Sequence, residues 1–119
     1  MTTLYGIPNC DTVKKARRWL EENNIDFTFH NFKKDGLDSD LLDNWFSIIG
    51  WEVLLNKRGT TWRKLDDNIK NNIDESSAKK IMLDNPSIIK RPILDLDPAE
   101  NAALKHVGFK EDEYTKIFS

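Results

Sequence analysis

Hydrophobic and polar residues follow two different periods along the first third of the chain. Residues 2–7, TTLYGI, are rich in β-branched and aromatic side chains and predict a strand. In residues 11–23 the apolar positions have helical spacing and form one stripe, which consists of Val13, Ala16, Trp19 and Leu20. Residues 25–32, IDFTFHNF, alternate again and predict a second strand. Because parallel strands need a crossover connection, we expect a right-handed β-α-β unit here.

The middle of the chain has the pattern of several helices separated by turns. Ser39 is expected to cap a helix that ends at Gly50. A tight turn is predicted at residues 58–59, and a short helix is expected directly after it. A further helix is predicted over residues 74–85, because an Asn-Pro pair closes its pattern. The middle is therefore expected to be a helical segment between strands.

The last part of the chain returns to strand patterns. Residues 88–96 predict a strand that contains or starts at Pro92, and residues 97–101, DPAEN, predict a turn. Residues 102–109 have the pattern of a returning strand, and residues 110–118 that of a final helix. Strands joined by so short a turn should form an antiparallel hairpin. The predicted order is β-α-β, helices, β-β-α, which is a mixed-sheet α/β fold.

Charge and composition exclude several classes of function. The formal net charge of the 119 residues is -2, so nucleic acid and anionic membranes are not expected partners. We also expect no secretory signal and no membrane span, because no apolar run reaches roughly 20 residues. The two histidines, His30 and His106, lie far apart without a cluster of ligands, so no metal site is expected.

Cys10 is the only cysteine of the chain, and it stands just before the first predicted helix. A single cysteine cannot form an internal disulfide, which fits a reducing compartment and predicts a cytoplasmic location. A helix start offers unpaired N–H groups that favour the thiolate, although the neighbouring carboxylate of Asp11 opposes it. From the residues alone, Cys10 is either such a nucleophile or a small apolar residue that fills the core.

Four segments together resemble one protein family. They are YGIPNCDTVKKA around Cys10, NKRGTTWRKL in the middle, and NPSIIKRPIL and VGFKEDEY near the end. The chain is similar to the arsenate-reductase-like (ArsC/Spx/YffB) group of the thioredoxin fold, above all to YffB-type members, over residues 4–118. The resemblance implies one thioredoxin-like domain over residues 1–119, with a mixed four-stranded sheet and a helical insertion at about residues 38–86.

The resemblance also implies a function. It favours a thiol–disulfide reductase with Cys10 as its nucleophile, and the nucleophile interpretation then prevails. A CxxC redox pair would need a cysteine at position 13, where this chain has Val13. The second thiol must therefore come from outside, and glutathione is the expected co-substrate, with no bound cofactor. Expected partners are glutathione and a small-molecule or protein disulfide or oxyanion substrate, and the protein is expected to be a monomer. The alternatives are an arsenate reductase and a non-catalytic, Spx-like regulator that binds RNA polymerase.

The resemblance assigns further residues to the site. The expected substrate- or glutathione-binding residues are Asn9, Thr12, Arg58, Arg91, Pro92 and Lys110. Pro92 is expected at the cis-proline position of the fold, with Arg91 beside Cys10 to hold an anion with two hydrogen bonds. From the residues alone, Arg91 and Arg58 are equally compatible with solvated surface charges. In arsenate reductases the arginine matching Arg58 aligns nearer Asn56, and Lys110 replaces a third arginine, which weakens the arsenate interpretation.

Overall fold

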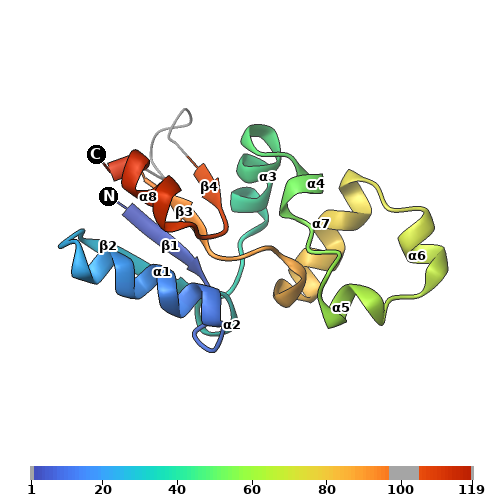
Figure 1. The fold of residues 1–119 in the computed structure, drawn as a ribbon. Helices are drawn as coiled ribbons and strands as arrows, with labels where there is room; N and C mark the ends of the chain where they lie inside the picture. Colours follow the sequence, from blue (N-terminus) through green and yellow to red (C-terminus); the bar gives the residue numbers. More distant parts are fainter. Residues whose placement is uncertain (1, 97–104, 119) are drawn as a thin grey trace. The chain divides into compact units, whose positions relative to one another are not determined.

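The computed structural model describes residues 2–96 and 105–118 (Figure 1). The chain divides into two compact units, residues 1–35 with 91–119, and residues 36–90. The two units are described in turn.

The first unit contains a four-stranded sheet with the order β2-β1-β3-β4. The strands are β1 (Thr2–Gly6), β2 (Phe27–Asn31), β3 (Ile93–Asp95) and β4 (Lys105–Val107). Strand β1 is parallel to β2 and antiparallel to β3, and β3 is antiparallel to β4. The mixed thioredoxin-like sheet and its hairpin are thus confirmed, while the predicted turn at residues 97–101 lies outside the described residues.

Two helices, α1 (Asp11–Glu22) and α8 (Glu111–Phe118), pack against one face of this sheet. Leu4 and Leu94 are register partners and therefore face the same side, where they form a core with Ala16, Leu20 and Tyr114. The predicted stripe of α1 is confirmed, since Val13, Ala16 and Leu20 are buried. Removal of such apolar surface from water is the main driving force for this packing. A short helix, α2 (Phe32–Asp35), follows β2.

The second unit consists of helices. They are α3 (Ser39–Ile48), α4 (Trp51–Leu54), α5 (Thr60–Arg63), α6 (Asp67–Asn71), α7 (Glu75–Asp84) and the 3-10 helix η1 (Pro86–Ile88). Its buried apolar side chains are Leu42, Trp45, Phe46, Leu54, Leu55, Ala78, Met82, Ile88 and Ile89. A single antiparallel bridge joins Leu55 to Ile89. The expected insertion at about residues 38–86 falls within this unit.

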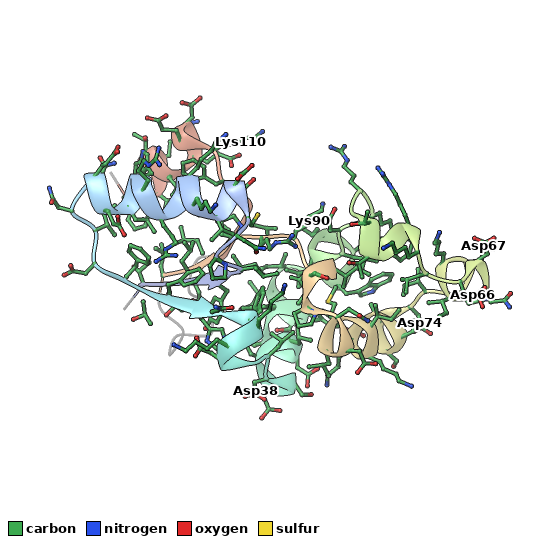
Figure 2. All side chains as sticks on the ribbon, turned by 90° about the horizontal axis from the view of Figure 1, so that it is seen from below. Asp38, Asp66, Asp67, Asp74, Lys90 and Lys110 are labelled. Carbon is green, nitrogen blue, oxygen red and sulfur yellow. The ribbon has the colours of Figure 1, made fainter. Side chains whose placement is uncertain are left out.

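The structure corrects two predicted helix boundaries. Asp38, not Ser39, is the N-cap of α3, and its carboxylate accepts a hydrogen bond of 3.2 Å from the backbone of Asp40 (Figure 2). Both residue types are favoured N-caps, so the sequence pattern did not separate the two neighbours. Gly50 has a φ of 99° and leads directly into α4, so it separates two helices. Its left-handed conformation suits glycine because it has no Cβ.

Asp74 and Ser77 form a capping box at the start of α7. The Asp74 carboxylate accepts the backbone N–H of Ser77 at 2.9 Å, and the Ser77 hydroxyl accepts the backbone N–H of Asp74 at 2.9 Å. The hydrogen bonds from Ser77 hold the pKa of Asp74 below its ordinary value. A lowered pKa in the folded state stabilises the protein above the unfolded pKa, and this stabilisation is lost as pH falls through the folded pKa.

We therefore predict that Asp74→Ala lowers the urea midpoint of unfolding at pH 7, and that its difference from the parent shrinks between pH 4 and pH 2. Urea titrations monitored by circular dichroism at several pH values measure this difference. Asp26→Ala, at an exposed position outside the helices, is the matched control and should leave the midpoint nearly unchanged. A deficit in Asp74→Ala that stays constant down to pH 2 would contradict the assignment.

Candidate functional site

Cys10 lies in the loop between β1 and α1. It is the N-cap residue of α1, with extended backbone angles of φ -90° and ψ 126°. Its N–H donates to the Ile7 carbonyl at 3.2 Å, and its carbonyl accepts the Lys14 N–H at 2.9 Å. The thiol is partly exposed, and within the described residues it makes no cap hydrogen bond to the first turn of α1. A thiol in this position is accessible to a small reactant.

The close approach of β1 to α1 fixes this loop. A Cβ at Gly6 would lie 2.8 Å from Cγ2 of Val13, closer than real carbon atoms approach. Glycine therefore allows the end of β1 to pass the first turn of α1. Pro8 and Asn9 are exposed in the turn that follows, and Asp11 begins the helix.

The sheet brings the predicted residues of the first unit to the same edge. Tyr5 pairs with Ile93, and Ile93 pairs with Val107, so the ends of β1 and β4 lie beside the beginning of β3. Cys10 follows β1, the Arg91–Pro92 peptide precedes β3, and Lys110 follows β4. The Arg91–Pro92 peptide bond is cis. The topology thus places a thiol, a guanidinium and an ammonium group on one edge of the sheet.

The side chains at this edge differ in exposure. Pro92 is buried and Arg91 is partly exposed, while Asn9 and Lys110 are exposed. Lys110 directly precedes α8, and its carbonyl accepts the Tyr114 N–H at 3.0 Å (Figure 2). Thr12 lies in the first turn of α1 and is partly buried. The structure describes these positions, and their binding roles stay predictions.

Gly108 is a functional candidate that the sequence interpretation did not single out. Its N–H donates a hydrogen bond of 2.8 Å to the Pro92 carbonyl, so it holds the proline loop to the end of β4. Its φ of 86° lies in the left-handed region that favours glycine. A glycine near the end of the strand predicted over residues 102–109 was the available signal.

Arg58 belongs to the second unit. It is exposed in the turn before α5, and its N–H donates to Oδ1 of Asn56 at 3.1 Å. Gly59 follows, and a Cβ there would meet Nδ2 of Asn56 at 3.1 Å. The predicted turn at residues 58–59 is therefore confirmed, whereas the role of Arg58 in anion binding stays a prediction.

Two phenols are buried in the first unit. Burial, with a smaller contribution from the Asp95 charge, raises the pKa of Tyr5 to about 12. Burial alone also raises the pKa of Tyr114 above its ordinary value. Both side chains are therefore neutral near pH 7 and serve packing; the Tyr114 ring contacts Trp19 and Phe109 edge-on, for example.

Among residues 2–96 and 105–118, no group of three or more His, Cys, Asp or Glu side chains is arranged to hold a metal ion. None of the helices that the structure describes has the length and apolar character needed to cross a membrane.

Residues 5–117 match the sequence model of the ArsC family. The chain belongs to the ArsC family. Among its relatives, an uncharacterized protein of Haemophilus influenzae is 47% identical over 119 residues, and the match spans all of both chains. Global transcriptional regulator Spx 1 of Oceanobacillus iheyensis is 34% identical, over 98% of this chain and 86% of the regulator. The predicted family is thus confirmed.

Solved structures show the same fold. The YFFB protein is 44% identical with a TM-score of 0.91, and the match covers 100% of both chains. An arsenate reductase (ArsC) related protein from Brucella melitensis is 48% identical with a TM-score of 0.78, over 99% of this chain and 94% of that one. These comparisons make this ArsC family member an arsenate-reductase-related protein and bear out its predicted similarity to YffB.

Cys10→Ser should leave the melting temperature of this ArsC family member unchanged or raise it. Serine is among the favoured N-cap residues, and the cysteine thiol makes no cap bond within the described residues. Cys10→Val is the control, because valine packs well but cannot cap. Differential scanning calorimetry should give Cys10→Ser a melting temperature at or above that of the parent. The melting temperature of Cys10→Val should lie below that of Cys10→Ser. The reverse order would mark Cys10 as an apolar packing residue.

Proposed function

We propose that this protein is a glutathione-dependent thiol–disulfide reductase in which Cys10 is the single nucleophile. The observation that supports this most is the place of the only thiol. It is partly exposed at the start of a 12-residue helix, on the sheet edge where the Arg91–Pro92 peptide precedes β3. The positive end of the helix dipole favours a thiolate there. Because the reaction draws on a glutathione pool, the proposal includes a cytoplasmic location.

The proposed reaction takes two displacement steps. The Cys10 thiolate attacks the glutathione sulfur of a mixed disulfide between glutathione and a substrate, and the substrate leaves as its thiolate, which takes up a proton. Cys10 then carries glutathione in a disulfide. The thiolate of a second glutathione attacks the sulfur of the carried glutathione, so oxidised glutathione leaves and the Cys10 thiolate is restored. The substrate sulfur of the mixed disulfide is reduced to a thiol and one free glutathione is oxidised, while the glutathione of the mixed disulfide stays at the disulfide level. No second cysteine of the chain is needed.

The charged residues of the edge have proposed roles in binding glutathione, which carries two carboxylates. Arg91 would hold a carboxylate with two parallel hydrogen bonds, whereas Lys110 would act as a point charge. Asn9 and Thr12 would each donate one hydrogen bond to glutathione beside the thiol. Pro92 would form part of the wall of the glutathione-binding site. Arg58 belongs to the second unit, and its role in anion binding is a separate prediction.

Relatives support two alternative functions. The similarity to an arsenate reductase related protein favours arsenate as a substrate. The 34% identity to a regulator named Spx 1 favours a binding protein without turnover. Both alternatives are outcomes of the same assay.

The test combines purified protein and glutathione with a glutathionylated peptide in one assay and with arsenate in another. We expect turnover of the peptide disulfide by the parent, none by Cys10→Ser, and an adduct one glutathione heavier on Cys10 by mass spectrometry. Turnover of arsenate alone would replace the proposal with the arsenate alternative. Lack of any turnover, with the parent folded, would favour the regulatory alternative.

Arg91→Lys should lower kcat/KM for the peptide disulfide by about one to two orders of magnitude. Lysine keeps the charge but loses one of two charge-assisted hydrogen bonds, which is worth roughly 1.5–3 kcal/mol. Arg18→Lys, on the exposed face of α1, is the matched control and should behave as the parent. Arg58→Lys should lower kcat/KM by a smaller factor than Arg91→Lys. Parent-like kinetics in Arg91→Lys would show that Arg91 makes no bidentate contact with the substrate.

A further inference from the structure

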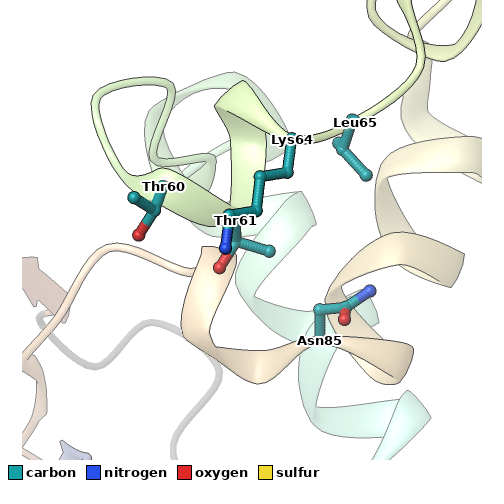
Figure 3. Close-up of a pocket in the computed structure, with 5 residues that line it drawn as sticks. All are labelled: Thr60, Thr61, Lys64, Leu65 and Asn85. Atoms are coloured by element: carbon teal, nitrogen blue, oxygen red, sulfur yellow. The ribbon is translucent and has the colours of Figure 1, made fainter.

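The second unit contains a hollow of about 280 Å³ beside α5. Its lining residues are neutral or cationic: Thr60, Thr61, Lys64, Leu65 and Asn85 (Figure 3). The threonines, the lysine and the leucine come from α5 and the residues just after it, while Asn85 lies between α7 and η1. All five belong to the same compact unit, so this hollow is a property of residues 36–90 alone.

Specific contacts hold the walls of the hollow in place. The Thr61 hydroxyl and the Ser87 hydroxyl are 3.0 Å apart in a partly buried hydrogen bond, which ties α5 to η1. Before α5, the Asn56 N–H donates to the Ile88 carbonyl at 2.8 Å. The hollow is therefore bounded by two segments that are bonded to each other.

The charge of the hollow is positive. Figure 3 shows the Lys64 side chain turned back along α5 toward Thr61. No carboxylate among the described residues forms an ion pair with the Lys64 amine. The ten residues 56–65, NKRGTTWRKL, contain four cations and no acid. Three acids stand next to the lining residues in the sequence: Asp66 caps α6, Asp67 lies 3.9 Å from the Lys70 amine, and Asp84 directly precedes Asn85. Lys64 is the charged side chain among the five residues of the lining.

The donors of the hollow fit a phosphate group better than a planar carboxylate. The lining offers the Lys64 ammonium group and two threonine hydroxyls from α5 and the residue after it, with the Asn85 carboxamide from the segment after α7. A planar carboxylate is matched best by the fork of an arginine instead. Lysine is a common point-charge ligand of phosphate. Leu65 adds an apolar wall on which the organic part of a phosphate ester can pack. We propose that this hollow is a phosphate-binding site, for free phosphate or the head group of a small phosphate monoester.

The site is tested on the full chain labelled with nitrogen-15, by titration with inorganic phosphate and, separately, phenyl phosphate at constant ionic strength. We expect saturable shifts of the amide signals of residues 60–65 and 85–87, with a dissociation constant in the millimolar range. Tighter binding of phenyl phosphate identifies a monoester site that uses Leu65, and equal binding identifies a site for the phosphate group alone. Sodium chloride should cause no saturable shift.

Variants show whether the named side chains make the site. Lys64→Met removes the charge with little change in length and should weaken phosphate binding at least about tenfold, the effect of losing one charge-assisted hydrogen bond. Thr61→Val should weaken it severalfold. Lys80→Met, at an exposed lysine of α7, is the matched control and should bind as the parent. Parent-like affinity in Lys64→Met, or shifts that do not saturate, would overturn the proposal.

Cys10→Ser separates this site from the proposed reductase. The variant should bind phosphate as the parent does, because the hollow uses none of the residues at the Cys10 edge. The test of the phosphate site is therefore independent of the proposed reaction with glutathione. A loss of phosphate binding in Cys10→Ser would contradict the proposed location of the phosphate site.

Discussion

The first unit depends on the close approach of β1 and α1 at Gly6. With any larger residue there, Val13 would have to move away, and it is one of the buried residues by which α1 packs on the sheet. The same approach determines where the loop of residues 7–10 can run, and hence where the thiol stands. A shift of α1 would also move the helix start on which Cys10 lies. The packing of the core and the position of the thiol therefore depend on the same close contact at Gly6.

The register of the strands determines which other segments of the chain lie beside the Cys10 loop. Tyr5, Ile93 and Val107 are aligned, so the ends of three chain segments far apart in sequence meet at one edge. The hydrogen bond from Gly108 to Pro92 joins two of these segments directly. This backbone hydrogen bond fixes the position of the segment before β3 relative to the end of β4.

The regular elements were predictable because each has a clear period or boundary residue. The stripe of α1, the alternation of β2 and the paired strands near the end of the chain gave the sheet and its topology. Helices α2, α4 and α6 were not predicted, because four or five residues are too few to show a helical period. The position of Cys10 at the start of α1 could be predicted from sequence, because the strand pattern ends and the helical pattern begins around residue 10. The hollow beside α5 could not, because it depends on Asn85, which tertiary folding brings to α5.

The single, partly exposed cysteine has a practical consequence for spectroscopy. The natural chain offers one thiol to which a spin label or fluorophore can be attached, with no other cysteine to be removed first. Such a label would stand at the N-cap of α1, where the backbone is held by hydrogen bonds on both sides of residue 10. A cysteine added in the second unit would supply a partner label. Paired-label distances would then measure the separation of the two units in solution.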